Sequence, residues 1–172
     1  VNAVAEQVEA DIYVNVQGDE PLIPIDTIDA AIRPLFDNSD VDIGTAAVPL
    51  KDAAELTDTN TVKVVCDLRN RALYFSRSPV PFVRDPGPGE GAPESLFRKH
   101  IGIYAFRKQA LADFASYPAS PLEKAEKLEQ LRALQHGMTI IVAPVKSDSI
   151  AVDVPSDIDR VLEFLRLNPV HA

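Results

Sequence analysis

The sequence predicts a single α/β domain with a mixed sheet, and two observations support this prediction. Along the 172 residues, apolar segments typical of buried strands alternate with amphipathic segments of helical period, which is the order expected of helices packed on a sheet. Two strand-like segments, 62–67 and 72–76, are joined by a short turn at 68–70, which predicts a β-hairpin. The hairpin adds antiparallel strands to the main sheet or forms a small second sheet.

Local patterns predict the remaining elements. Apolar and β-branched runs predict strands at 12–16, 41–48, 100–106 and 139–144. Periodicity and start signals predict helices at 1–10, from 24 to 36, at 108–116, at 120–136 and from 156 onward, with a helical turn within 51–60. Pro34 is expected to kink or shorten the second helix, and Ser120 and Glu123 to form a capping box. Five prolines and three glycines between 78 and 94 predict a mobile loop at about 78–97.

Composition limits the classes of function. Lys and Arg number 17 against 26 Asp and Glu, and the net charge of −9 argues against a nucleic-acid surface but not against a small phosphorylated substrate. No apolar run approaches the roughly 20 residues that a membrane-spanning helix needs, so no membrane insertion is expected. Cys66 is the single cysteine, which excludes an internal disulfide and is compatible with a cytoplasmic location.

The segment 12–21 contains the strongest functional signal. It begins as a buried strand and then becomes polar at Gln17, Gly18, Asp19 and Glu20, so these side chains are expected at the carboxyl end of a strand. A carboxylate held there suits Mg²⁺. The alternative is an acidic turn that only meets solvent. Asp153 also follows an apolar run, and with Asp19 it could hold one Mg²⁺; alternatively it only interacts with the dipole of the helix that follows.

Further polar residues are candidates for substrate binding. The fork of Arg77, at the end of a strand, suits a carboxylate, although it could instead be a surface Arg paired with an acid. His100 and Tyr104 share one face of a strand and could bind hydroxyl groups, or His100 could be structural. Glu129 and Gln130 are expected in mid-helix, with Glu129 partly in apolar surroundings, or else as an ordinary exposed pair.

Six short motifs occur in one order along the chain. They are Val-Gln-Gly-Asp-Glu-Pro at 16–21, Ala-Leu-Tyr-Phe-Ser-Arg at 72–77, His-Ile-Gly-Ile-Tyr at 100–104, Ser-Pro-Leu-Glu at 120–123, Leu-Glu-Gln-Leu-Arg at 128–132 and Val-Asp-Val-Pro-Ser-Asp at 152–157. In this set the sequence resembles the 3-deoxy-D-manno-octulosonate (Kdo) cytidylyltransferases, also called CMP-Kdo synthetases, over nearly its whole length. The resemblance implies a three-layer, Rossmann-like nucleotidyltransferase fold in a homodimer formed through residues 73–77 and the nearby loop.

The resemblance also implies an activity and roles for the candidate residues. The family activates Kdo with CTP for lipopolysaccharide synthesis: the anomeric hydroxyl attacks the α-phosphate, and pyrophosphate leaves. Asp19 and Asp153 match the metal aspartates, and Arg77 would bind the sugar carboxylate. Gln17, His100, Tyr104, Glu129 and Gln130 would bind the sugar hydroxyls.

The sequence departs from the family pattern in two places. No basic, glycine-containing nucleotide loop precedes Asp19, and the chain begins at Val1 inside an uncapped amphipathic segment. We therefore expect the C-terminal portion of a longer protein, inactive in isolation and without assigned contacts to the cytosine or the triphosphate. Val154 stands where the family usually has Thr, and residues 148–151 replace a glycine-rich approach to Asp153. A CMP-sialic acid synthetase and a non-catalytic sugar-acid binding module remain alternatives.

Overall fold

A computed structural model describes residues 1–50, 52–84, 96–152, 154–155 and 157–168. Its six-stranded sheet has the order β4-β3-β5-β2-β6, with β1 also paired to β5. The strands are β1 (Ile12–Val16), β2 (Ile43–Pro49), β3 (Lys63–Cys66), β4 (Ala72–Ser76), β5 (Arg98–Arg107) and β6 (Ile140–Pro144). Only β2 and β6 pair in parallel; the other pairs are antiparallel. The predicted mixed α/β sheet is confirmed, and the hairpin β3–β4 belongs to it rather than to a second sheet.

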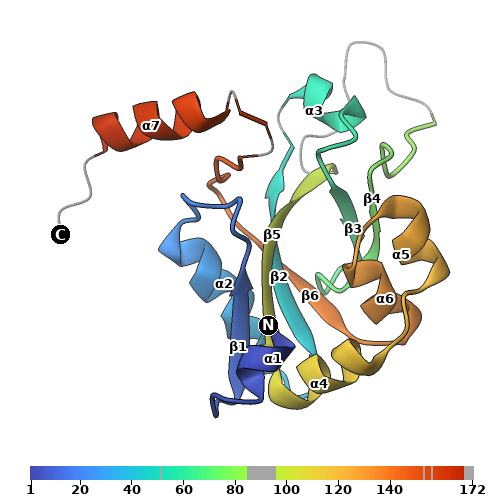
Figure 1. Cartoon of the computed structure of the whole chain (residues 1–172). Helices are drawn as coiled ribbons and strands as arrows, with labels where there is room; N and C mark the ends of the chain where they lie inside the picture. Colours follow the sequence, from blue (N-terminus) through green and yellow to red (C-terminus); the bar gives the residue numbers. More distant parts are fainter. Residues whose placement is uncertain (51, 85–95, 153, 156, 169–172) are drawn as a thin grey trace.

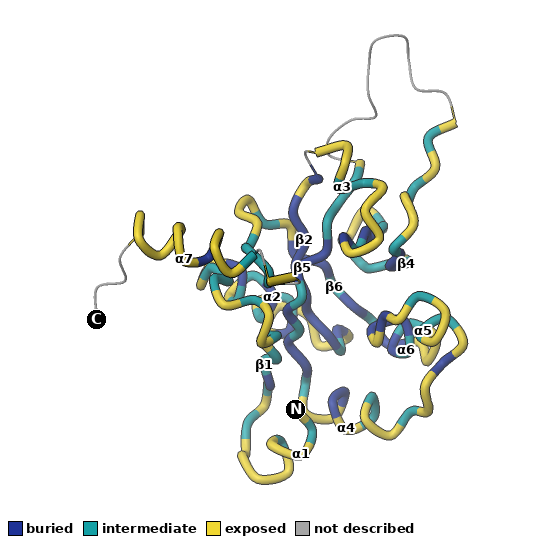
Figure 2. Tube along the Cα trace, turned by 45° about the horizontal axis from the view of Figure 1, so that its top comes forward, coloured by how far each residue is buried: buried dark blue, intermediate teal, exposed yellow. Residues whose placement is uncertain are grey.

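Helices cover both faces of the sheet (Figure 1). They are α1 (Asn2–Ala5), α2 (Ile25–Asp37), α3 (Ala53–Thr57), α4 (Lys108–Ser116), α5 (Pro121–Glu126), α6 (Gln130–Gln135) and α7 (Asp157–Leu167). On one face Ala31 and Leu35 of α2 pack with Ile101, Ile103 and Ala105 of β5. On the other face, side chains of α4, α5 and α6 pack on the sheet in a separate core cluster. Figure 2 shows buried residues concentrated in the strands between these helices.

The structure corrects three predicted helices. The helix expected at 1–10 covers only Asn2–Ala5. Pro34 does not shorten α2, which continues to Asp37, and buried Ala31 and Leu35 keep that face of the helix on the sheet. Phe36, in the last turn of the same helix, is 76% exposed.

The third correction concerns the helix expected at 120–136, which is two short helices. Lys127 adopts the left-handed conformation with φ of 56°, which ends α5, and the chain turns before α6 starts at Gln130. Leu128 in this turn is buried in the core, so the turn exchanges helical hydrogen bonds for apolar packing. The predicted capping box at Ser120 and Glu123 is confirmed, with N–O distances of 3.3 and 3.0 Å. Residue 156, where the last helix was predicted to begin, and residues 85–95 of the predicted loop lie outside the described residues.

Candidate functional site

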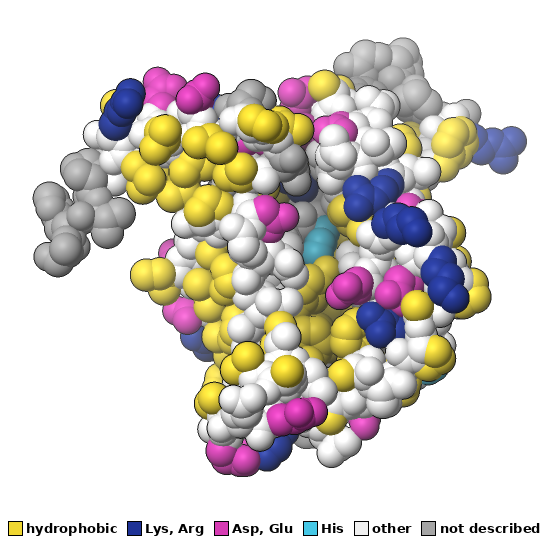
Figure 3. Space-filling view, viewed as in Figure 1, with side chains coloured by type: hydrophobic (Ala, Val, Ile, Leu, Met, Phe, Trp, Pro, Cys, Tyr) yellow, Lys and Arg dark blue, Asp and Glu magenta, His cyan; other side chains and the backbone are white. Residues whose placement is uncertain are grey.

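A cavity of about 460 Å³ opens on the face of the sheet opposite α2. It lies where β1 and β4 end, over the middle of β5, and beside the turn between α5 and α6. Figure 3 shows a hollow in this face, with a histidine at its floor and acidic and basic side chains around it. Its lining includes all seven of the described candidate residues, namely Gln17, Asp19, Arg77, His100, Tyr104, Glu129 and Gln130. A smaller cavity of about 180 Å³ adjoins it and shares four of them.

The acidic turn after β1 is placed by the antiparallel pairing of β1 with β5. This pairing sets Val16 opposite Ile103, so the chain leaves the sheet beside Gly102. A Cβ at Gly102 would lie 3.4 Å from Cγ of Gln17 and 3.7 Å from Oε1 of Glu20, so glycine leaves room for both side chains. The turn closes with a 3.1 Å hydrogen bond from Glu20 N to Gln17 O. The predicted delivery of polar side chains at a strand end is confirmed.

Asp19 is exposed at the rim of the cavity. Its predicted partner Asp153 lies outside the described residues, but the preceding residue, Val152, donates a 2.8 Å hydrogen bond to the backbone carbonyl of Asp19. This bond joins two segments that are more than a hundred positions apart in the sequence, and both were predicted to carry a metal ligand. The part of the chain that the structure describes contains no group of three or more His, Cys, Asp or Glu side chains suited to a metal ion.

Glu20 is a cavity residue to which the sequence analysis gave no role. Its Oε2 atom is buried and has no hydrogen-bond partner among the described residues. Burial raises the pKa of the Glu20 carboxyl, and the charges of Asp19 and Asp148 add to this rise, while hydrogen bonds from the Ser149 side chain and the Gly102 backbone to the carboxyl lower the pKa. Its position next to Asp19 at the strand end was the available signal. A buried carboxylate oxygen without a partner in a cavity is free to accept a ligand.

The imidazole of His100 is buried and neutral. Its Nε2 lies 2.9 Å from Oγ1 of Thr45, and that hydroxyl donates to Ile103 O at 2.6 Å, so Nε2 carries the hydrogen. Burial lowers the pKa of His100 to about 3. The ring meets Phe75 edge-on and tilts against Tyr104, with centroids 5.0 and 5.4 Å apart. These contacts agree with the alternative in which His100 is structural. Its Nδ1 atom, however, is an acceptor without a partner among the described residues.

The guanidinium of Arg77 contacts two backbone segments. Nε donates to Glu126 O at 2.8 Å, and Nη1 donates to Thr59 O at 2.7 Å. Both acceptors belong to segments that border the cavity, because Asp58, Asn60 and Lys127 line it. Arg77 therefore lies at the predicted site, but two of its donor groups are engaged within the protein.

The turn between α5 and α6 places Glu129 and Gln130 differently from each other. Gln130 is buried, 6% exposed, in the wall of the cavity. Glu129 is exposed, so the predicted apolar surroundings of this carboxylate are wrong. The reason is the left-handed Lys127, which breaks the helical stripe on which that prediction relied. Burial raises the pKa of the Tyr104 phenol, and the negative charge of Glu129 raises this pKa further.

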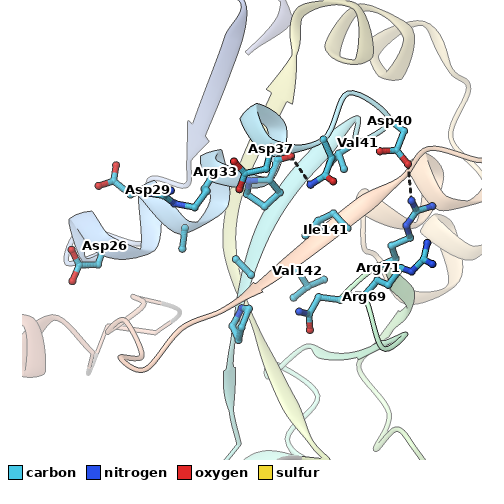
Figure 4. A pocket seen from close by; sticks show the side chains of 16 residues that line it. Asp26, Asp29, Arg33, Asp37, Asp40, Val41, Arg69, Arg71, Ile141 and Val142 are labelled. Atoms are coloured by element: carbon cyan, nitrogen blue, oxygen red, sulfur yellow. Dashed lines mark hydrogen bonds and ion pairs between the residues drawn. The ribbon is translucent and has the colours of Figure 1, made fainter.

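A larger groove, of about 920 Å³, lies on the α2 side of the molecule (Figure 4). Charged side chains of α2 and of the turn between β3 and β4 line it, with an ion pair of 2.6 Å between Arg71 and Asp40. None of the candidate residues lines this groove. Within the described residues, no helix is both long enough and apolar enough to cross a membrane.

The fold is that of the nucleotidyltransferases. The chain is similar to a solved structure of CMP:2-keto-3-deoxy-manno-octonic acid synthetase complexed with CTP, with a TM-score of 0.87 and 37% identity over 96% of this chain and 66% of that one. The inositol-1-phosphate CTP transferase from T. maritima, at a TM-score of 0.57 and 16% identity over 99% of this chain and 62% of that one, shares the fold alone.

The particular family follows from the sequence comparisons. A family model described as cytidylyltransferase matches residues 1–140, and the chain belongs to this family. Relatives named 3-deoxy-manno-octulosonate cytidylyltransferase include those of Geobacter sulfurreducens, 46% identical over 95% of this chain and 67% of its own length, and of Syntrophotalea carbinolica, 47% identical over 95% and 66%. That of Solibacter usitatus is 44% identical over 96% and 64%. The resemblance found in the motifs is confirmed, and the chain spans about two-thirds of the length of these relatives.

Proposed function

We propose that the full protein transfers CMP from CTP to the anomeric hydroxyl of Kdo, giving CMP-Kdo and pyrophosphate for lipopolysaccharide biosynthesis. One observation carries the proposal: the seven described candidate residues come from four separate segments of the chain and line a single cavity. The names of the relatives at 44–47% identity favour Kdo over sialic acid as the substrate.

The lining of the cavity suits a polyhydroxylated acid. Gln17 and Gln130 offer amide groups, and His100 Nδ1 offers an acceptor for a hydroxyl group. Arg77 and Lys127 supply positive charge for the carboxylate. These contacts would fix the orientation of the anomeric hydroxyl for attack on the α-phosphate of CTP in line with the departing pyrophosphate. A His100 pKa of about 3 makes this side chain a poor general base, so its role is to position the sugar.

Asp19 and Asp153 are the residues we propose for holding Mg²⁺. Three features support the fit: the carboxylate of Asp19 at the rim, the hydrogen bond from Val152 N to Asp19 O, and the unpartnered Oε2 of Glu20. When bound, the ion would neutralise charge on the phosphoryl oxygens. The chain itself contributes by keeping the two acidic segments side by side.

Three further parts of the proposal concern the whole protein. A homodimer through residues 73–77 is supported by the position of β4 at the end of the sheet and by Leu73, which is 61% exposed. A cytoplasmic location fits the single cysteine. Because the chain spans about two-thirds of its relatives and carries no basic glycine-containing loop before Asp19, we expect the isolated 172 residues to be inactive.

The test is a pyrophosphate-release assay on the full-length protein with CTP, Mg²⁺ and either Kdo or sialic acid. We expect release that requires Kdo and that falls about 10³-fold in Asp19→Asn and in Asp153→Asn, because each substitution removes a charged ligand. Asp40→Asn, in the groove on the α2 side, is the matched control and should retain full activity. Absence of release with any sugar acid, from a folded protein, would favour the binding-module alternative.

A further inference from the structure

Beside the cavity, the end of β4 and the end of α5 are joined by hydrogen bonds in both directions. The carboxylate of Glu126, the last residue of α5, accepts from Ser76 Oγ at 2.7 Å and from Arg77 N at 2.9 Å. In return, Arg77 Nε donates to the backbone carbonyl of Glu126, which the helix end leaves without an intrahelical donor. Tyr74 adds a longer contact of 3.4 Å to the same carboxylate.

A buried lysine connects this junction to the loop at 58–61, which also borders the cavity. The ammonium group of Lys63 on β3 is fully buried and donates to the carbonyls of Asp58, Thr61 and Arg77 at 2.9, 2.6 and 2.5 Å. Asp58, Thr61 and Arg77 all line the cavity. The loop at 58–61, the end of β4 and the end of α5 are therefore held together by Arg77, which lines the cavity, and by Lys63 and Glu126, which are absent from its lining.

The segment that follows Glu126 carries several of the cavity residues. Lys127, Leu128, Glu129 and Gln130 all line the cavity, and Lys127 holds a backbone conformation that a non-glycine residue rarely adopts. Two short helices of six residues each cannot fix this turn by their own hydrogen bonds. The position of the turn thus depends on what anchors the end of α5.

From these contacts we infer that Glu126 is a positioning residue for the sugar-acid side of the cavity. Its carboxylate fixes the turn between α5 and α6 on the end of β4, and so sets where Arg77 and residues 127–130 stand around the ligand. Glu126 is absent from the cavity lining and acts through these neighbours. The identity of the ligand rests on the proposed function, whereas the anchoring of the turn does not.

The experiment compares Glu126→Ala and Glu126→Gln with Ser120→Ala in the full-length protein. Ser120→Ala is the matched control, because it removes the cap at the opposite end of α5 and leaves the junction with β4 intact. For Glu126→Ala we expect the KM for Kdo to rise about tenfold while the KM for CTP stays within twofold. Glu126→Gln keeps an acceptor for Arg77 N and should recover most of the affinity. Ser120→Ala should lower the melting temperature without changing either KM.

Amide hydrogen exchange supplies a second readout that needs no catalysis. Glu126→Ala should speed exchange at the amides of Arg77, Leu131 and Arg132 at least tenfold, and Ser120→Ala should change them much less. If the wild-type protein neither binds nor uses Kdo, the proposed function fails, and the exchange data still decide the anchoring role. Unchanged exchange and an unchanged KM for Kdo in Glu126→Ala would overturn the inference. If Glu126→Ala does not fold, Ser76→Ala, which removes one donor to the carboxylate, replaces it and should show the same pattern with a smaller effect.

Discussion

The two faces of the sheet carry two cavities that differ in how their polar groups are held. In the groove on the α2 side, the charges lie on the surface: Arg71 and Asp40 pair with side-chain exposures of 39% and 62%. In the cavity on the other face, Glu20 has a buried oxygen without a partner and His100 is buried and neutral. The groove is about twice as large, yet it contains none of the candidate residues.

In this protein, the buried polar groups of Glu20 and His100 line the cavity that holds the candidate residues, and not the groove of larger volume. A paired surface charge costs little and contributes little to stability. A buried acceptor without a partner is costly, and proteins retain such groups mainly where a ligand completes them. Substitutions that act on one face of the sheet and not on the other test this difference between the cavity and the groove.

The largest expected effect is on stability, and it distinguishes alanine substitutions at two glycines. A Cβ at Gly44 and a Cβ at Gly102 would lie on opposite faces of the sheet. A Cβ at Gly44 would lie 1.9 Å from the backbone carbonyl oxygen of Ala31 in α2, so Gly44→Ala must displace the helix. At Gly102, which lines the candidate cavity, the atom nearest to an added Cβ is Cγ of the flexible Gln17 side chain at 3.4 Å. We expect Gly44→Ala to lower the free energy of unfolding by about 3 kcal/mol or more and Gly102→Ala by about 1 kcal/mol or less.

Urea denaturation of both glycine variants checks this prediction. Gly102→Ala should also weaken Kdo binding, because it crowds Gln17 and Glu20 at the cavity. Equal destabilisation by the two substitutions would show that the packing of α2 on β2 is looser than the structure indicates.

The second prediction concerns the buried histidine and the pH dependence of stability. The unfolded chain has a His100 pKa near 6.5, and burial lowers it to about 3 in the folded protein. Between these values the unfolded state binds a proton that the native state does not, so stability falls as the pH falls below 6.5. The slope from this one group approaches about 1.4 kcal/mol per pH unit.

Urea denaturation at several pH values from about 7.5 down to about 4.5 measures this slope. His100→Gln should flatten it, and His136→Gln, which replaces an exposed histidine stacked on Tyr117, serves as the matched substitution. An NMR titration in which the ring of His100 protonates near its ordinary pKa would contradict the burial argument.

Much of the fold and of the site was accessible from the sequence. The strands, the capping box at Ser120 and the mixed sheet followed from periodicity and local start signals. The grouping of Gln17, Asp19, Arg77 and the β5 residues around one cavity followed from the motifs. The strands and the capping box depend on contacts between near neighbours or on patterns along one element, whereas the grouping around one cavity was implied by the resemblance to a known family.

What could not be predicted depends on contacts between distant segments. The break at Lys127 is favoured by burial of Leu128 and by the junction of Glu126 with β4, and neither is visible in a helical wheel. Pro34 is tolerated in α2 because that helix packs along the sheet. The engagement of Arg77 with Glu126 and Thr59, and of His100 with Thr45, likewise required the partners to be located in three dimensions.

The smallest expected effect is a change in stability at two non-glycine residues in the left-handed conformation. One lines the candidate cavity and the other lines the groove on the α2 side. Lys127, with φ of 56°, lines the candidate cavity, and Asn70, with φ of 60°, lines the groove. Asparagine tolerates this conformation well, and Asn70 also accepts a 2.9 Å hydrogen bond from Arg98. Lysine tolerates it poorly, so Lys127→Gly should raise the free energy of unfolding by about 0.5–1 kcal/mol, while Asn70→Gly should not raise it.

Binding measurements then show why a lysine occupies the strained position. Three described lysine and arginine side chains line the candidate cavity. Lys99 pairs with Glu55 and Asp148, and Arg77 contacts backbone carbonyls. The ammonium group of Lys127 has no partner among the described residues. If its charge serves the sugar carboxylate, Lys127→Gly should be more stable yet bind Kdo about three- to tenfold more weakly, a loss of about 1 kcal/mol. Lys127→Arg should retain the affinity. A Lys127→Gly variant that gains stability and keeps full affinity would leave only Arg77 as the cation for the carboxylate. Ligand binding would then not explain why a lysine occupies this strained position.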